Sequence, residues 1–314
     1  MSSLEQTETV QLDNGVKLHN ITTNKTKVPI KKKIVPYLYL LPAVLLVGVF
    51  FIYSAVYTLV ISFTKWDGIN LPDFVGFSNY ISIFTDKIFT TSIINTIIWV
   101  LASLLLPVGV GLAIAVGIQH LRWSIVYKNI FYLPHAISLT TTGVVWAFLL
   151  SPGGLSSLFD LFGWKDLAAI DWLLTPTVNT LSMIWTYTWQ SMGTNMVLFL
   201  IGLNAIPKEP LEAAMIDGAS GWRLFKNITF PLLRPITSVV VLMSLVNSFK
   251  VFDTIWVMTQ GGPFRSSETL AVTMYRETFV LSHYGYGSAI AVILSIFVLI
   301  LSWGYLKTTL KQEG

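Results

Sequence analysis

Six long apolar stretches constrain the fold of this chain more than any other feature. A helix needs about 20 apolar residues to cross the hydrocarbon core of a bilayer. Only 11% of the residues are charged and 54% are hydrophobic, far from the average of soluble proteins. The sequence therefore predicts an all-α integral membrane protein with six transmembrane helices. The predicted spans are residues 37–63, 92–117, 129–150, 179–203, 236–258 and 286–306.

The placement of positive charge predicts how these spans are oriented. Of the 20 Lys and Arg residues, 14 lie in the N-terminal tail, the second and fourth connections and the C-terminus. Five lie in the other connections, and Lys250 lies inside the fifth span. Short loops rich in Lys and Arg stay in the cytoplasm. We therefore expect both termini and the connection 203–235 on the cytoplasmic side.

The chain divides into one membrane domain between two tails. Residues 1–36 are polar and rich in Thr, Asn and Lys, so we expect a largely disordered cytoplasmic tail. Residues 37–307 form the predicted membrane domain, and residues 308–314 a short cytoplasmic tail. The chain has no Cys, and its four His residues show no metal-ligand spacing, which excludes disulfides and predicts no metal site.

The connection 203–235 is a long polar segment between two apolar spans, and it predicts two short helices and a turn. Pro210 suits the first turn of a helix that runs to Asp217, where Gly218 ends it in a left-handed conformation. Ser220 is expected to cap a second helix, which Pro231 should stop. Apolar side chains recur at spacings of three and four through both helices, at Leu211, Ala214, Met215, Trp222, Phe225 and Ile228.

This segment resembles the EAA loop of permease subunits in ATP-binding-cassette (ABC) importers. The residues that carry the resemblance are Glu212, Ala213, Ala214, Asp217, Gly218 and Ala219, followed by Phe225, Ile228 and Pro231. The resemblance implies the type I ABC importer permease fold and a location in a bacterial cell membrane. It also implies that the first helix docks in a cleft of a cytoplasmic ATPase subunit. An ordinary amphipathic connector would explain the helices but not the Gly and Pro at these positions.

Polar side chains gather at similar depth in the fourth and fifth spans. Residues 185–195 combine hydroxyls and amides with aromatic rings, and residues 244–253 add Ser, Asn, Lys and Asp. Polar groups in hydrocarbon are expensive and mark either helix packing or a pathway. Hydroxyls, amides and aromatic faces suit a neutral polyhydroxylated ligand such as a sugar. Interhelical hydrogen bonding is the alternative explanation. Lys250 and Asp253 are three residues apart and can pair with each other.

The resemblance extends over most of the chain and narrows to the carbohydrate-uptake branch of the importers. It rests on residues 64–68, 74–84, 250–263, 267–279 and 284–296, and is similar to permeases for maltose, glycerol 3-phosphate and multiple sugars. It implies the first permease of a heterodimer, two ATPase subunits and an extracytoplasmic sugar-binding protein. Alignment on the maltose relative implies sugar contacts at Gln190, Ser191, Thr194, Ser244, Asn247, Ser248 and Val251.

Motifs for chemistry are absent from the sequence. No phosphate-binding G-x-x-x-x-G-K-[ST] loop and no catalytic motif occurs, so we expect no enzyme and no cofactor here, with ATP and Mg²⁺ on a partner ATPase. The alternative is an ion-coupled secondary transporter that uses Lys250 and Asp253. Internal repeats would favour it, and none is visible. A membrane enzyme is a third and weaker interpretation.

Two local features predict details of helix geometry. Gly109, Gly111 and Gly117 in the second span indicate close packing against another helix. Pro134 is expected to kink its helix or begin it.

Overall fold

The computed structural model describes residues 30–249 and 251–313. Most of the expected N-terminal tail, residues 1–29, lies outside the described residues. The chain forms two compact units, residues 1–53 and 54–314. The first unit contains helix α1 (Ile30–Val47) and the π-helical segment η1 (Gly48–Tyr53). Its large side chains face outward, with Tyr39 82% and Phe51 72% exposed.

The second unit is built almost entirely from helices. Its first half contains α2 (Ser54–Ile61), β1 (Thr64–Lys65), β2 (Asp73–Phe74), α3 (Ser78–Thr85), α4 (Lys87–Ile118), α5 (Ser124–Tyr132), η2 (Leu133–Ala136), α6 (Leu139–Leu150), α7 (Leu155–Leu161), α8 (Lys165–Ala168) and α9 (Val178–Ala205). Its second half contains α10 (Lys208–Ile216), α11 (Gly221–Leu224), η3 (Phe225–Thr229), α12 (Phe230–Leu232), α13 (Arg234–Phe249), α14 (Asp253–Met258), α15 (Leu270–Tyr275), η4 (Arg276–Val280) and α16 (Tyr284–Glu313).

Helices long and apolar enough to cross a membrane confirm the predicted fold class. Among the described residues they are Tyr39–Ile61, Lys87–Ile118, Leu139–Leu161 and Tyr284–Lys307, and the pair Gly221–Leu232 and Arg234–Phe249, bent by 73°, adds a fifth if it is one span. The predicted number was six. The missing one is α9, which has 28 residues and therefore spans about 42 Å. Helix α9 carries no charged residue, but it contains many polar residues, and these lower its mean hydropathy. Many of these polar side chains are buried.

The third predicted span is not one continuous helix. Helix α5 ends at Tyr132, and Pro134 lies near the start of the 3₁₀ turn η2. Helix α6 then begins at Leu139, with the Ser138 side chain accepting a hydrogen bond from the Thr141 amide. The predicted span 129–150 is therefore wrong in its continuity, because Pro134 interrupts the helix, as expected for proline.

The fifth predicted span is also interrupted. Helix α13 ends at Phe249 and α14 starts at Asp253, so the prediction of one helix over 236–258 is wrong. Helix α14 ends at Met258, and the Gly-Gly-Pro segment follows three residues later. Lys250 lies outside the described residues, so its predicted pairing with Asp253 stays a prediction.

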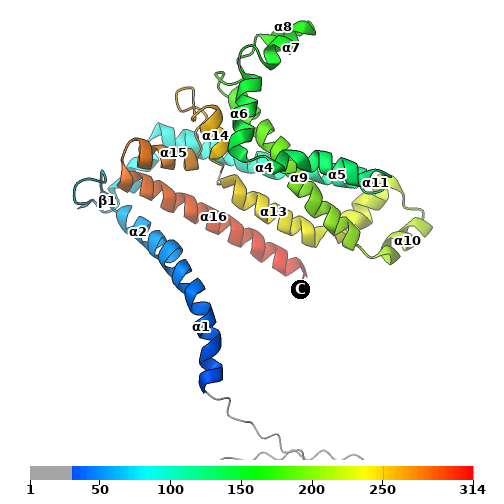
Figure 1. Cartoon of the computed structure of the whole chain (residues 1–314), viewed down its shortest axis with the longest axis horizontal. Coiled ribbons are helices and arrows are strands. Elements are labelled where there is room, and N and C mark those ends of the chain that lie inside the picture. The colour runs from blue at the N-terminus through cyan, green and yellow to red at the C-terminus, as the bar shows by residue number, and fades with distance from the viewer. Residues whose placement is uncertain (1–29, 250, 314) are drawn as a thin grey trace, which may run out of the picture. The chain divides into compact units, whose positions relative to one another are not determined.

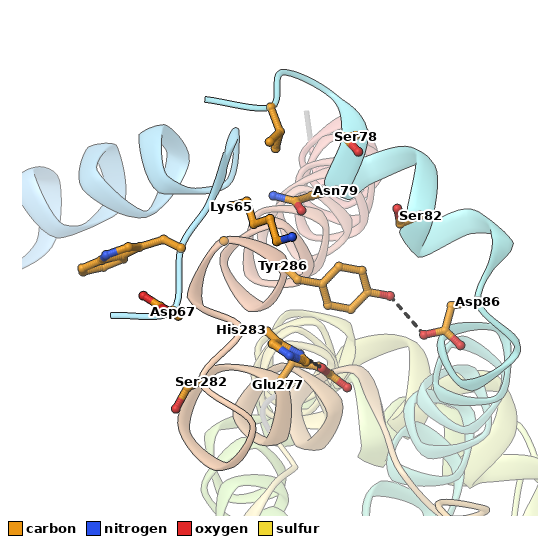
Figure 2. Close-up of a pocket in the computed structure, with 13 residues that line it drawn as sticks. Lys65, Asp67, Ser78, Asn79, Ser82, Asp86, Glu277, Ser282, His283 and Tyr286 are labelled. Carbon is orange, nitrogen blue, oxygen red and sulfur yellow. Dashed lines mark hydrogen bonds and ion pairs between the residues drawn. The ribbon is translucent and has the colours of Figure 1, made fainter. Parts of the chain in front are cut away.

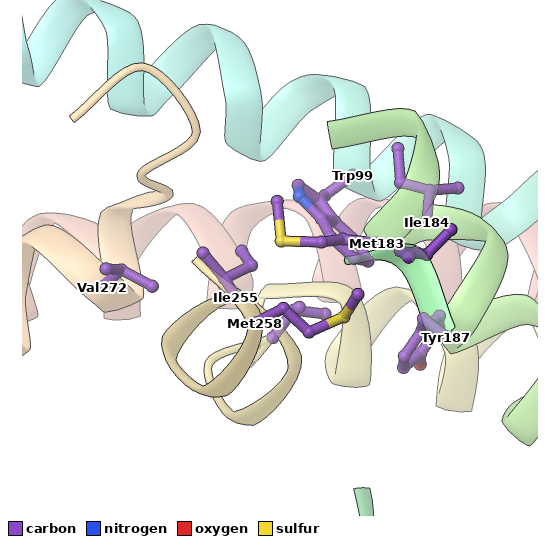
Figure 3. Packing of buried hydrophobic residues seen from close by; sticks show 9 residues of the cluster. Trp99, Met183, Ile184, Tyr187, Ile255, Met258 and Val272 are labelled. Atoms are coloured by element: carbon purple, nitrogen blue, oxygen red, sulfur yellow. The ribbon is translucent and has the colours of Figure 1, made fainter. Parts of the chain in front are cut away.

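The packed core of the second unit lies between α4 and α9. One buried cluster joins Trp99 of α4 and Met183 of α9 to Ile255 of α14 and Val272 of α15 (Figure 3). A second cluster continues along the same two helices toward α13. A β-carbon on Gly111 would come within 2.8 Å of the Asn195 β-carbon, which confirms the close approach.

The other two glycines of the predicted packing set lie in open space. A β-carbon on Gly109 or Gly117 would meet nothing within 4 Å, so the prediction is wrong for both. They fall away from the helix interface because 3.6 residues complete a turn, and only Gly111 faces α9.

The two ends of the second unit differ in structure. Figure 1 shows β1 and α15 at one end, here called the hairpin end, and α10 at the other, here called the α10 end. Strands β1 and β2 pair antiparallel, with Thr64 opposite Phe74, and α3 follows them. The sequence analysis did not predict this strand pair. Helix α9 joins the two ends. Near its start, the Asn179 Nδ2 donates to the Gly262 carbonyl, in the connection between α14 and α15, over 2.7 Å, and its C-terminal end leads into α10.

Candidate functional site

The first helix of the 203–235 loop forms as its sequence predicts. Helix α10 begins at Lys208 after the extended Pro207 and ends at Ile216. Gly218 follows with φ +83°, in the left-handed region that glycine occupies without strain. The Gly218 amide donates to the Met215 carbonyl over 3.0 Å and the Ala219 amide to the Ala214 carbonyl over 2.9 Å. This hydrogen-bonded turn fixes the direction in which the chain leaves α10.

The second half of the loop departs from the prediction at two residues. Ser220 occupies the position before α11 with extended backbone, but its side chain accepts no capping hydrogen bond. Pro231 does not stop the helix, which continues through η3 and α12 to Leu232 and then bends by 73° into α13. The π-helical turn of η3 explains the tolerance. Proline clashes with the carbonyl four residues earlier in an α-helix, and a wider turn relieves that clash.

The six residues of the EAA resemblance lie together on and after α10. Glu212, Ala213, Asp217 and Gly218 are exposed, whereas Ala214 and Ala219 are partly buried. Beside them, Ile216 is 87% exposed and Trp222 is 74% exposed. Exposed apolar side chains of this size, rimmed by polar residues, are typical of a protein interaction surface.

The second helix of the loop lies against α4. A groove of about 470 Å³ separates them, lined by Gly109, Leu112, Ala113 and Val116 of α4 and by Gly221, Trp222 and Phe225. The rings of Trp222 and Phe225 are 5.3 Å apart. The loop continues through the bend at Leu233 into α13, so a movement of the loop would be passed to α13.

The predicted sugar contacts on α9 lie close together, with Gln190 buried and Ser191 and Thr194 partly buried. The Gln190 Nε2 donates to the Ile137 carbonyl over 3.2 Å, and the Ser191 hydroxyl donates to the Gln190 Oε1 over 3.3 Å. The Thr194 Oγ1 is buried and has no hydrogen-bond partner within the described part of the chain. An unpaired buried hydroxyl costs free energy and is available to a ligand or a water molecule.

The predicted contacts on the fifth span lie in different surroundings. Ser244 and Ser248 are buried on one face of α13, and the Ser248 hydroxyl donates to the Leu245 carbonyl over 2.7 Å. Asn247 is exposed. Val251 belongs to the apolar cluster around Trp99, so its side chain packs in the core.

A network of charged side chains at the hairpin end was missed by the sequence analysis. The carboxylate of Glu268 is fully buried, and it accepts hydrogen bonds from Arg265 at 2.9 Å and from Arg276 at 2.6 Å. Arg265 also reaches the Glu277 Oε1 at 3.1 Å, and the His283 Nδ1 lies 3.0 Å from the Glu277 Oε2. The sequence contains four charged residues within thirteen positions between two apolar spans, and this pattern could have indicated the network.

The ion pairs of this network raise the pKa of Arg265. Burial alone lowers the pKa of Arg265, but the hydrogen bonds and charges of Glu268 and Glu277 outweigh it, so the pKa is raised. The network also reaches α4, because the Thr273 hydroxyl donates to Glu268 over 2.8 Å and contacts the Ser92 hydroxyl at 2.6 Å.

A polar hollow of about 550 Å³ adjoins the network (Figure 2). Tyr286 of α16 donates to the Asp86 Oδ2 across it over 3.1 Å. Glu277 and His283 line one side, and Lys65 and Asn79 line another. The hollow opens at the hairpin end, far from the 203–235 loop, and none of the seven predicted sugar contacts lines it.

Comparisons with known proteins add to this geometry. The family model described as "Binding-protein-dependent transport system inner membrane component" matches residues 109–310. The chain is 38% identical to a probable ABC transporter permease protein of Pyrococcus horikoshii, over 88% of this chain and 96% of that relative. It is 31% identical to the arabinooligosaccharides transport system permease protein of Bacillus subtilis, over 90% and 91%.

The fold is also found among solved structures. An example is a bacterial alginate ABC transporter in complex with an alginate pentasaccharide-bound periplasmic protein. The TM-score is 0.76 at 22% sequence identity, and the match covers 88% of this chain and 94% of the other.

Proposed function

Since the chain belongs to the family of binding-protein-dependent transport system inner membrane components, we propose that it is one permease of an ATP-driven oligosaccharide importer. In this proposal it forms the translocation pathway with a second, different permease. The observation that carries the proposal is the 203–235 loop, whose α10, left-handed Gly218 and exposed apolar side chains form a docking element.

We assign coupling to the ATPase to this loop. Helix α10, with Glu212 and Ala213 exposed, docks in a cleft of one of two cytoplasmic ATPase subunits, which hold ATP and Mg²⁺. Closure of the ATPase dimer pulls α10, and the hydrogen-bonded turn at Gly218 passes the movement to α11 and η3. The bend into α13 and the packing of α13 against α4 then carry it to the spans. Transport follows as a shift between inward- and outward-facing populations.

The proposed sugar pathway runs past α9 and α13. Gln190, Ser191 and Thr194 on α9, with Ser244, Asn247 and Ser248 on α13, supply hydroxyls and amides without a formal charge. Val251 supports this wall from the core. The unpaired Thr194 hydroxyl favours a neutral, polyhydroxylated ligand. The Bacillus relative is named for arabinooligosaccharides and the solved structure for alginate, and we infer an oligosaccharide for this chain too.

The proposal places the chain in the cytoplasmic membrane of a bacterial cell, with both termini and the α10 end in the cytoplasm. The hairpin end then faces the extracytoplasmic side, where a sugar-loaded binding protein delivers the substrate. The charge asymmetry of the connections supports this orientation.

The test is ATP hydrolysis by the assembled complex in lipid vesicles. The chain is reconstituted with the second permease and the ATPase, and each candidate binding protein is added with and without oligosaccharide. We expect one loaded binding protein to stimulate hydrolysis several-fold over the basal rate. A complex that hydrolyses no ATP under any sugar, with uptake that stops only when ion gradients collapse, would instead establish an ion-coupled transporter.

A further inference from the structure

The connection between α14 and α15 presents one phenylalanine entirely to solvent. The Phe264 side chain is 101% exposed, so it touches no other part of the chain. Large apolar side chains in that state are unfavourable in water unless a partner covers them. The connection lies at the hairpin end, opposite the 203–235 loop (Figure 1).

The backbone holds this ring outward in an unfavourable conformation. Phe264 and Arg265 have φ of 51° and 64°, and Gln260 has φ of 51°. The left-handed region is unfavourable for residues other than glycine. Gly261 is required beside them, because a β-carbon there would lie 2.4 Å from the Glu268 Cγ. Such conformations persist only where surrounding contacts fix them.

The contacts that fix the loop lie on both sides of the exposed ring. Before it, the Gly262 carbonyl accepts from the Asn179 Nδ2 at 2.7 Å and from the Ser267 hydroxyl at 2.8 Å. After it, Arg265 is bound to Glu268 and Glu277, and the Asn95 Nδ2 donates to the Ser266 carbonyl over 2.7 Å. The ring is therefore displayed on a rigid platform and loses little entropy when it is covered.

The surroundings of Phe264 identify the kind of partner. The side chains of Arg265 and His283, 23% and 60% exposed, lie next to the loop, and ionisable groups of this kind do not face hydrocarbon. The polar hollow shares Glu277 and His283 with the same network, so a protruding ring and a hollow adjoin each other. An exposed ring beside a polar hollow suits a water-soluble protein that binds at the hairpin end.

We infer that Phe264 and the adjoining polar hollow form the docking surface for the sugar-loaded extracytoplasmic binding protein, with the Phe264 ring as its anchor. The inference rests on the proposed function, since it names which part of the chain meets that partner. An aromatic anchor at the centre of an interface commonly carries a large share of the binding free energy.

The experiment compares three variants in the reconstituted complex, with the loaded binding protein that stimulates the wild type. For Phe264→Ser we expect the binding-protein concentration that gives half-maximal stimulation to rise at least tenfold. Phe264→Trp should keep it near the wild-type value. Phe162→Ser is the matched control, because Phe162 is 68% exposed but lies beyond α7, and it should also leave the value unchanged.

A wild-type response from Phe264→Ser would overturn the inference, as would equal losses in Phe264→Ser and Phe162→Ser. Replacing Phe264 with a benzoyl-phenylalanine crosslinker gives a direct readout. Capture of the binding protein supports the inference, and capture of the second permease overturns it. The proposed function fails separately, by absence of stimulation in the wild-type complex.

Discussion

At the scale of single residues, the buried carboxylate of Glu268 stands out. It has no access to water, and it accepts hydrogen bonds from two arginines and from the Thr273 hydroxyl. Removing one partner of a buried ion pair costs more than the pair contributes, because the remaining charge keeps its desolvation penalty. Arg265 and Arg276 depend on Glu268 in this way.

We therefore predict that Glu268→Ala destabilises the protein by roughly 3 kcal/mol. Thermal unfolding of the purified chain in detergent measures this as a fall in the midpoint temperature. The control is Glu209→Ala, which removes an exposed carboxylate from α10 and should leave the midpoint nearly unchanged. Equal midpoints for the two variants would contradict the role given to Glu268.

A second prediction at this scale concerns Gly111 in the contact between α4 and α9. A β-carbon there would lie 2.8 Å from the Asn195 β-carbon and 2.9 Å from the Met196 backbone nitrogen. Backbone cannot yield as a flexible side chain does, so Gly111→Ala should destabilise by about 1–3 kcal/mol. Gly117→Ala meets nothing within 4 Å and should be neutral or slightly stabilising in the same unfolding assay.

At the scale of elements, the turn between α10 and α11 controls how the loop behaves. Its direction depends on Gly218 at φ +83° and on two backbone hydrogen bonds that close the end of α10. A β-carbon on Gly218 would meet nothing within 4 Å. Glycine is therefore needed here for its backbone conformation and not for lack of space. A residue that tolerates the left-handed region should preserve the turn.

The third prediction follows from this turn. Gly218→Val should leave the chain inserted in the membrane and bound to its second permease, but reduce binding-protein-stimulated sugar uptake at least tenfold. Gly218→Asn is the matched control and should keep most of the uptake, since asparagine enters the left-handed region readily. Uptake of labelled sugar by cells, normalised to permease abundance, gives the comparison. Wild-type uptake by the Val variant would show that the turn does not carry coupling.

At the scale of the whole molecule, the second unit has a polar element at each end of its long helices. Helix α9 connects the turn-bounded loop at the α10 end with the charged network at the hairpin end. At about 42 Å, it is longer than the hydrocarbon core of a bilayer. We therefore expect the two elements to lie on opposite sides of the membrane.

The fourth prediction tests that arrangement by labelling. The chain contains no cysteine, so Ser156→Cys in α7, within the connection between α6 and α9, and Asn227→Cys in the loop each introduce a single reactive thiol. A membrane-impermeant maleimide should label Ser156→Cys in intact cells and Asn227→Cys only after the membrane is opened. The reverse pattern would invert the proposed orientation and place the Phe264 surface in the cytoplasm.

Much of the fold and the loop could be predicted because the signals are local. Apolar runs of bilayer length, Pro210 and Gly218 act within a few residues of themselves, and α10 and its left-handed turn follow. Two kinds of prediction were wrong. The packing of Gly109 and Gly117 depends on which face of α4 meets α9, and the helix breaks depend on neighbouring turns. Pro231 was expected to stop a helix, and the π-helical η3 before it lets the helix continue.

Sequence alone therefore determined that this is a helical membrane protein with a two-helix polar loop, because burial of apolar surface and backbone conformational preference are properties of short segments. Only the tertiary structure decided which polar residues meet. Arg265 and Glu277 are joined across twelve positions, and Asn95 reaches Ser266 across 171. Contacts at such separations depend on how α4, α9 and α15 pack together, and the display of Phe264 at the hairpin end depends on that packing.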